Sequence, residues 1–299
     1  MRPLEPGDIV RLVSPSGPAE PERVTRGVEL LSGWGLTVER GESVLGRHGF
    51  FGGTDDARLR DLDAALADPS VRAVVCTRGG YGVQRIVDRV RFGAPKHIVG
   101  FSDITALQLA AWRFGRWPAV HGPGAAWLDS RLPLSSEDSL RRALMTASPL
   151  PLRRDPAAET GPVVVPGGPV EGVLLGGNLT MLTSTIGTAD MPDLAGAILL
   201  LEDVDEAPYR VDRMLTQLSR SSGLRGVQAV AVGQFTNCAG RGGVSVADVL
   251  LERLAPLGVP VLGGLPVGHG PGQETVVLGA PAVLDVTAGT LVSRAAPVA

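Results

Sequence analysis

The chain has 299 residues, of which 44% are hydrophobic, and a formal net charge of −3. This length indicates two domains of about 100–200 residues each, and the composition is sufficient for a sizeable buried core. The weakly acidic balance excludes the basic field that nucleic-acid binding requires. The single lysine, Lys96, lies in Ala-Pro-Lys-His, which excludes a P-loop.

No segment approaches the roughly 18 uninterrupted apolar residues of a membrane span, and the N-terminus lacks an apolar signal core. We therefore expect a cytoplasmic protein with no membrane association. The two cysteines, Cys76 and Cys238, have no metal-like spacing and suit a reducing compartment. There is no His-Glu-x-x-His motif and no cluster of His or Cys, so we expect neither a metal nor a cofactor.

The first half of the chain alternates short strand-like and helix-like segments. This alternation predicts a parallel sheet with helices on both faces. In such a sheet, ligands bind at the carboxyl ends of the strands. Strands are expected over residues 9–14, 37–39, 72–76, 97–101 and 119–120, and helices over 21–31, 54–66, 83–90 and 103–114.

The second half is expected to form a smaller, mixed α/β domain. Residues 149–169 contain six prolines and no clear period, which predicts a linker between an N-terminal domain (1–148) and a C-terminal domain (170–299). Strands are expected over 170–175, 197–201, 227–232, 261–267 and within 275–292, and helices over 178–186, 211–218 and 246–254.

The motif Gly-Phe-Ser-Asp at residues 100–103 joins an apolar strand to a helix. A serine on such a turn exposes its hydroxyl, and the N–H of Asp103 at the helix N-terminus favours negative charge. Gly100 leaves room for a tight turn. The usual nucleophile elbow also has glycine two residues after the serine, where this chain has Ile104. The alternative is that Ser102 or Asp103 only caps the helix.

A second strand end carries the run Arg-Gly-Gly-Tyr-Gly at residues 78–82. Glycines allow a ligand to approach the backbone closely, and their N–H groups can bind an anion or an oxyanion. The run lacks the Gly-x-Gly-x-x-Gly pattern of a dinucleotide loop. An ordinary glycine turn before a helix is the alternative.

A nucleophilic serine needs a base, and the chain has four histidines, at 48, 97, 121 and 269. His48 lies in a polar loop, and His97 starts a strand at the wrong end to meet Ser102. His121 and His269 each follow an apolar strand and precede a glycine. Either could reach the edge of the sheet that carries the serine.

A base in turn needs a carboxylate that orients the imidazole and stabilises its cation. Several carboxylates follow the strand expected at 197–201, in Glu-Asp-Val-Asp-Glu at residues 202–206. Glu202 is the first of them and lies at the strand's end. The alternative is a solvated acidic turn.

Together these segments resemble the murein-tetrapeptide LD-carboxypeptidase family of serine peptidases. Each motif is weak alone, but they occur in the family's order over nearly the whole chain. The matching segments are Gly7-Asp8, Ser14-Pro15-Ser16-Gly17-Pro18, Arg78-Gly79-Gly80-Tyr81-Gly82, Gly100-Phe101-Ser102-Asp103-Ile104-Thr105, His121-Gly122-Pro123, Gly176-Gly177-Asn178-Leu179, Leu201-Glu202-Asp203-Val204 with Pro208-Tyr209-Arg210-Val211-Asp212-Arg213-Met214-Leu215, and Gly268-His269-Gly270.

The resemblance implies a Ser–His–Glu triad with Ser102 as nucleophile, His269 as base and Glu202 as acid. It also implies an oxyanion hole made by the backbone N–H groups of Gly80 and Asp103. The implied fold is a Rossmann-like N-terminal domain with a parallel sheet, followed by a smaller mixed α/β C-terminal domain, with the site between them. The resemblance further implies a homodimer.

The family has two branches. One releases terminal D-alanine from cytoplasmic muropeptides in cell-wall recycling, and the other, similar to the microcin C immunity hydrolase, cleaves aminoacyl-nucleotide analogues. The run Glu-Asp-Val-x-Glu-x-Pro-Tyr-Arg-x-Asp-Arg at 202–213 resembles the first branch. Arg78 and Arg210 are candidates to bind the substrate's terminal carboxylate. The rival hypotheses from other classes are a non-catalytic protein that binds a small ligand and a nucleotide-dependent enzyme.

Overall fold

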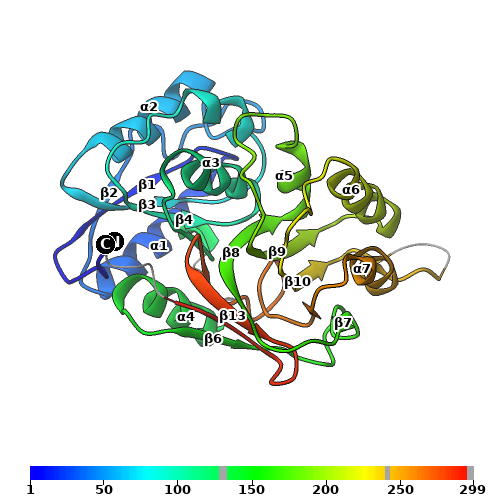
Figure 1. Cartoon of the computed structure of the whole chain (residues 1–299). Helices are drawn as coiled ribbons and strands as arrows, with labels where there is room; N and C mark the ends of the chain where they lie inside the picture. The colour runs from blue at the N-terminus through cyan, green and yellow to red at the C-terminus, as the bar shows by residue number, and fades with distance from the viewer. Residues whose placement is uncertain (128–132, 240–242, 295–299) are drawn as a thin grey trace.

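The computed structural model describes residues 1–127, 133–239 and 243–294. The structure is of the mixed α/β class, as the sequence predicts, and is built on one sheet of six strands and one of eight. In Figure 1 most helices lie on the outside, whereas α3 (Thr105–Gly115), β4 (His97–Gly100) and β8 (Val170–Asn178) lie nearer the centre of the molecule.

The six-stranded sheet is parallel except for the edge strand β12 (Val276–Leu278). Its order is β12-β5-β4-β3-β1-β2, and β12 pairs antiparallel with β5. Because β1 to β5 run in one direction, their carboxyl ends lie along one edge. The strands are β1 (Ile9–Val13), β2 (Thr37–Arg40), β3 (Val71–Cys76), β4, β5 (Ala119–His121) and β12 (Val276–Leu278).

Helices cover both faces of this sheet, because its central strands are apolar on both sides. Val75 and Val99 pack in one core with α1 and α4, whereas Val74 and Cys76 pack in another with α2 and α3. Thr54 caps α2 by accepting a hydrogen bond from Ala57 N at 3.3 Å. The helices are α1 (Pro21–Gly33), α2 (Asp55–Ala67), α3 (Thr105–Gly115) and α4 (Leu134–Met145).

The eight-stranded sheet has the order β6-β14-β13-β8-β9-β10-β11-β7, with β8 to β11 parallel. Helices α5 to α7 pack on one face, and apolar side chains of the outer strands pack against the other. The remaining elements are β6 (Leu150–Arg153), β7 (Val164–Val165), β9 (Ala197–Val204), β10 (Ala229–Thr236), β11 (Val261–Leu262), β13 (Pro281–Asp285), β14 (Thr290–Ser293), α5 (Leu179–Ser184), α6 (Pro208–Arg220) and α7 (Val246–Leu254).

Three local expectations differ from the structure. Of the strand expected over 261–267, only β11 (Val261–Leu262) forms. The helix expected over 83–90 is instead two short 3₁₀ turns, Val83–Arg85 and Val87–Arg89. They are separated by Ile86 at φ −126°, and this segment is rich in β-branched residues, which favour helix weakly. The expected linker, 149–169, contributes β6 and β7 to the eight-stranded sheet. The division of the chain into domains at 148 and 170 stays a prediction.

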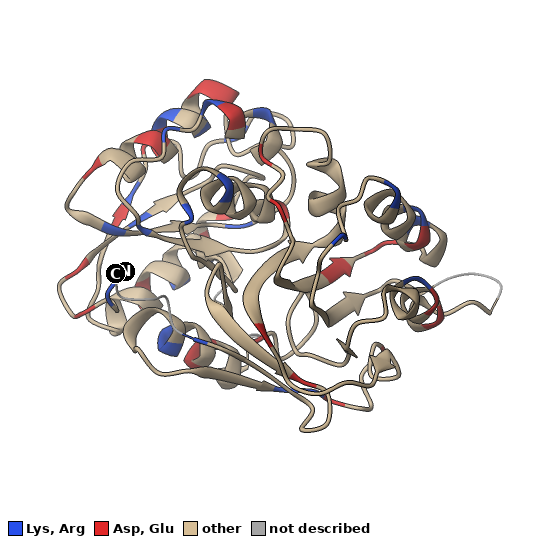
Figure 2. Ribbon diagram, viewed as in Figure 1, with Lys and Arg blue, Asp and Glu red and all other residues tan. Residues whose placement is uncertain are grey.

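Charged residues lie mainly on the outer helices and loops, and the central strands carry few of them (Figure 2). Glu202 and Asp203 are exceptions, because both are buried at the end of β9. Among the residues that the structure describes, no helix has the length and apolar character needed to cross a membrane.

We expect the strand β12, which comes from the C-terminal part of the chain, to stabilise the six-stranded sheet. Val277 has no exposed surface and packs in the core that contains Val99 and Val120. Val277→Ala should lower the free energy of unfolding by about 2 kcal/mol, measured by urea denaturation. Val244→Ala is the control: this side chain is 52% exposed, and its loss should change stability by less than about 0.5 kcal/mol.

Candidate active site

Ser102 lies on a turn with unusual backbone geometry. Its φ is +62°, a left-handed conformation that non-glycine residues rarely adopt and that gathers at functional sites. Strand β4 ends at Gly100, and the 3₁₀ turn Ser102–Ile104 leads directly into α3. Among the described residues, no side-chain hydrogen bond caps this turn or α3, so the helix-cap alternative is wrong.

The glycine-rich loop packs directly on this serine. A Cβ added at Gly79 would lie 2.7 Å from Ser102 Cβ and 2.9 Å from its Oγ. Only glycine allows this approach. Gly80, at φ +125°, is the next residue of the same loop and is exposed. The structure therefore brings together the two strand ends that the sequence singled out.

Asp103 holds the loops around the serine through its side chain, a role that the sequence did not indicate. Its Oδ2 accepts hydrogen bonds from Ser16 Oγ at 2.7 Å and from Val83 N at 2.9 Å. The carboxyl is buried, and burial raises the pKa of Asp103 above its ordinary value. The loop after β1, the glycine loop and the Ser102 turn are thus joined through one carboxylate.

Glu202 and His269 form a buried pair beside this turn. His269 Nδ1 donates to Glu202 Oε2 at 2.7 Å, with the Glu202 side chain fully buried and that of His269 9% exposed. The ring of Phe101, which precedes Ser102, lies 4.7 Å from the imidazole of His269 between centroids. Because Nδ1 carries the shared proton, Nε2 is the basic nitrogen of the neutral ring.

The charges around His269 set its basicity. Burial lowers the pKa of His269, but the Glu202 carboxylate, with smaller contributions from Asp203 and Asp205, raises it above 6.5 overall. Burial and the neighbouring Glu202 raise the pKa of Asp203 to about 6. Asp203 accepts hydrogen bonds from Asn178 Nδ2 at 3.0 Å and from Thr180 N at 2.9 Å, which fixes the ends of β8 and β9.

His121 is the other histidine that the sequence left open as a base, and it faces the carboxylate oxygen of Glu202 that His269 does not bond. Its Nε2 lies 3.9 Å from Glu202 Oε1, and both side chains are fully buried. The remaining histidines are elsewhere: His48 is exposed, and His97 is buried at the start of β4 with Nε2 3.0 Å from Arg2 O. Of the four, only His269 hydrogen-bonds the carboxylate within the described residues.

Two glutamines hold the loop that carries His269. Gly270 N donates to Gln234 Oε1 at 2.8 Å, and Gln234 Nε2 donates to Pro271 O at 3.0 Å. Gln273 Nε2 donates to Gly268 O. Sequence reasoning missed both residues, although Gln234 is the one amide side chain in the mainly apolar strand β10, which is a usable signal of a polar contact.

The two arginines proposed for substrate binding lie in different surroundings. Arg78 is exposed next to the serine turn, and its Nε donates to Gly79 O at 3.2 Å. Arg210 is exposed on α6, where Nη1 lies 3.5 Å from Glu206 Oε2 and Nε donates to Tyr209 Oη at 3.2 Å. Arg78 thus adjoins the candidate site directly. The contacts of Arg210 are with Tyr209, its neighbour in sequence, and with Glu206, four residues earlier.

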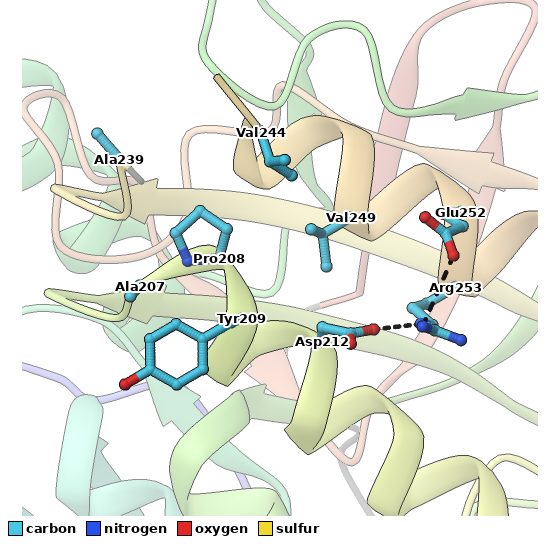
Figure 3. Close-up of a pocket in the computed structure, with 9 residues that line it drawn as sticks. All are labelled: Ala207, Pro208, Tyr209, Asp212, Ala239, Val244, Val249, Glu252 and Arg253. Carbon is cyan, nitrogen blue, oxygen red and sulfur yellow. Dashed lines mark hydrogen bonds and ion pairs between the residues drawn. The ribbon is translucent and has the colours of Figure 1, made fainter. Parts of the chain in front are cut away.

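A separate pocket of about 620 Å³ lies between α6 and α7 (Figure 3). Apolar side chains such as Pro208 and Val249 line it, and Arg253 pairs with Asp212 at one end. Ser102 and the Glu202–His269 pair do not line this pocket. In the parts of the chain that the structure describes, no group of three His, Cys, Asp or Glu side chains is arranged to hold a metal ion.

A strained serine after a parallel strand, beside a buried histidine–carboxylate pair, is an arrangement typical of the serine hydrolases. Comparison with known proteins narrows this class. Residues 10–122 match the model of the LD-carboxypeptidase N-terminal domain, and residues 171–284 match that of the LD-carboxypeptidase C-terminal domain. The chain belongs to the LD-carboxypeptidase family of serine peptidases.

Individual relatives cover nearly the whole chain. A Streptomyces coelicolor protein named as a carboxypeptidase is 43% identical over 96% of this chain and 94% of its own. The murein tetrapeptide carboxypeptidase of Pseudomonas aeruginosa is 34% identical over 92% of each chain. The crystal structure of muramoyltetrapeptide carboxypeptidase from Oxalobacter formigenes superposes with a TM-score of 0.84 at 29% identity, over 97% of this chain and 100% of that one.

The fold is also shared with the microcin C7 self-immunity protein. Its complex with aspartyl sulfamoyl adenosine superposes with a TM-score of 0.86 over 98% of this chain and 97% of that one, at 24% identity. At this identity the likeness concerns the fold alone.

Removing the Asp103 carboxylate should loosen the loops that it joins. Asp103→Ala leaves the buried Ser16 hydroxyl and Val83 N–H without their acceptor, which should cost about 1–3 kcal/mol of unfolding free energy. Chemical denaturation measures this change. The control is Asp138→Ala, since that side chain is 62% exposed and its ion pair with Arg142 is long, at 4.0 Å; equal losses in the two variants would contradict the role of Asp103.

Proposed function

We propose that this protein is a cytoplasmic carboxypeptidase that hydrolyses the L–D peptide bond before the terminal D-alanine of murein tetrapeptides, in cell-wall recycling. The observation that carries the proposal is the hydrogen bond from His269 Nδ1 to the buried Glu202, at 2.7 Å, beside the turn that presents Ser102. The names of the relatives from Pseudomonas aeruginosa and Oxalobacter formigenes support murein tetrapeptides as the substrate class.

The proposed reaction has two acyl-transfer steps. His269 Nε2 removes the proton of the Ser102 hydroxyl while Ser102 Oγ attacks the carbonyl carbon before the terminal residue. The Glu202 carboxylate stabilises the imidazolium that forms. The peptide C–N bond then breaks as His269 returns the proton to the leaving amine, and water releases the acyl group from Ser102 by the reverse sequence.

The oxyanion of each tetrahedral intermediate is assigned to the backbone N–H groups of Gly80 and Asp103. Contact between Gly79 and Ser102 supports this assignment, because it puts the glycine loop against the nucleophile. Arg78, exposed on the same loop, is proposed to bind the substrate's terminal carboxylate, with Arg210 as the second candidate. A homodimer is proposed from the family resemblance.

Substrate choice and the nucleophile are tested together by mass spectrometry. The wild-type protein is incubated with a murein tetrapeptide and, separately, with aspartyl sulfamoyl adenosine. Release of D-alanine from the tetrapeptide is expected, and Ser102→Ala should lower this rate at least about 10³-fold because the nucleophile is lost. Ser184→Ala, which changes an exposed serine on α5, should keep the wild-type rate.

Other outcomes point to the rival functions. Cleavage of the sulfamoyl adenosine alone would assign the protein to the branch of the microcin C immunity hydrolase. No turnover of either compound, together with no labelling of Ser102 by a fluorophosphonate probe, would favour a non-catalytic protein that binds a small ligand. Near-normal tetrapeptide turnover by Ser102→Ala would contradict the mechanism.

The pH dependence of kcat/KM should report the titration of His269 beside Glu202. The base acts when neutral, and its pKa is raised above 6.5, so kcat/KM should rise with pH and level off only above that value. In Glu202→Gln the largest of the charges that raise the pKa of His269 is lost, while burial still lowers it. The acid limb should therefore move to lower pH, while the plateau falls by about 10²–10⁴-fold. An unmoved acid limb in this variant would count against His269 as the base.

A further inference from the structure

His121 joins the strand that leads to Ser102 to the carboxylate of Glu202. It ends β5, where it is register-paired with Gly100, two residues before Ser102. Its side chain is fully buried, and its Nε2 faces Glu202 Oε1 across 3.9 Å. Glu202 belongs to β9 in the eight-stranded sheet, so this contact crosses from one sheet to the other.

Gln108 determines which nitrogen of His121 carries the proton. The Gln108 side-chain amide donates to Gly100 O at 2.8 Å and to Val120 O at 3.1 Å. Both acceptors are carbonyls, so the amide nitrogen must face them, and Oε1 of Gln108 must face His121 Nδ1, 3.2 Å away. An acceptor at that place requires the hydrogen on Nδ1, which leaves Nε2 of the neutral ring unprotonated.

The unprotonated Nε2 therefore faces a carboxylate oxygen. Both His121 Nε2 and Glu202 Oε1 are buried without a hydrogen-bond partner among the described residues. Two facing acceptors do not bond each other, and leaving them unpaired costs free energy of folding. Arrangements that cost stability persist where they serve the site.

We propose that His121 is a positioning residue, which presents an unprotonated Nε2 to Glu202 Oε1 and so keeps His269 as the carboxylate's hydrogen-bond donor. This inference rests on the proposed function of Ser102, His269 and Glu202. A carboxylate with one donor keeps more negative charge available than one with two, and it stabilises the imidazolium of His269 more strongly.

The charges around both rings agree with this arrangement. Burial lowers the pKa of His121 to about 4, with Glu202 opposing the shift and His269 adding to it, so the ring is neutral near pH 7. Burial lowers the pKa of His269, but Glu202, Asp203 and Asp205 raise it, and the net shift is upward. His121 and His269 also pack on the same ring, that of Phe101, at centroid distances of 6.4 and 4.7 Å.

The tautomer of His121 is measured first, by ¹⁵N NMR of the full-length wild-type protein with labelled histidine. With four histidines in the chain, His121→Gln and His97→Gln assign the signals by subtraction. The proposal expects His121 to be neutral at pH 7 with hydrogen on Nδ1. A hydrogen on Nε2, or a charged ring, would overturn it, and this measurement needs no variant to be active.

The second measurement is the pKa of His269 in the variants. The side-chain amide introduced by His121→Gln places an N–H within reach of Glu202 Oε1, and the extra donor should lower the pKa of His269 by on the order of 0.5 unit. His97→Gln is the matched control, because His97 is also buried in the same sheet but lies at the opposite end of β4; it should leave the pKa unchanged. An unchanged pKa of His269 in His121→Gln would overturn the proposal, since a residue that only packs would lower activity or stability without moving this titration. If His121→Gln does not fold, glutamine substitution of each of the other three histidines in turn assigns the remaining signal to His121, and the wild-type tautomer decides.

These measurements separate this inference from the proposed function. The tautomer and the titration of His269 are observed without turnover. Near-normal tetrapeptide turnover by Ser102→Ala would contradict the proposed function. The tautomer of His121 and the titration of His269 would still test how His121 affects Glu202 and His269.

Discussion

The carboxylate of Glu202 is withdrawn from solvent at the end of β9, and a buried carboxylate is costly unless a partner stabilises its charge. His269 supplies that partner from a different part of the chain. The segment that carries His269 begins at β11 in the eight-stranded sheet and ends at β12 in the six-stranded sheet. The pairing of His269 with Glu202 therefore depends on one segment being anchored in both sheets.

The part of the site around Ser102 depends on close packing of loops and on the hydrogen bonds of Asp103. Gly79 lies against Ser102 so closely that any side chain there would collide with the serine. Asp103, adjacent to the serine, binds both the loop after β1 and the start of the turn at Val83. A serine with left-handed φ is strained, and this network of contacts is what holds it in that conformation.

Membership of the LD-carboxypeptidase family is shown by the domain matches and by relatives that cover nearly all of the chain. The alternating pattern of the sequence correctly predicted an α/β fold, and Thr54 was identified as the start of a helix. The helix expected over 83–90 was wrong, because apolar spacing alone did not reveal the break at Ile86. Residues 149–169 look like a linker in sequence because prolines are frequent there, yet parts of the segment pair with distant strands.

By itself, the sequence determined the strand ends where polar residues gather, and it reduced the candidates for the base to His121 and His269. Its periodicity is local, so it could not say which of these meets Glu202. The family resemblance implied His269, but only the tertiary structure shows the contact: the β11–β12 segment brings His269 Nδ1 to 2.7 Å from the carboxylate, whereas Gln108 gives the hydrogen of His121 to Nδ1, away from Glu202. Hydrogen-bond direction depends on atoms distant in sequence, and no spacing of residues along the chain encodes it.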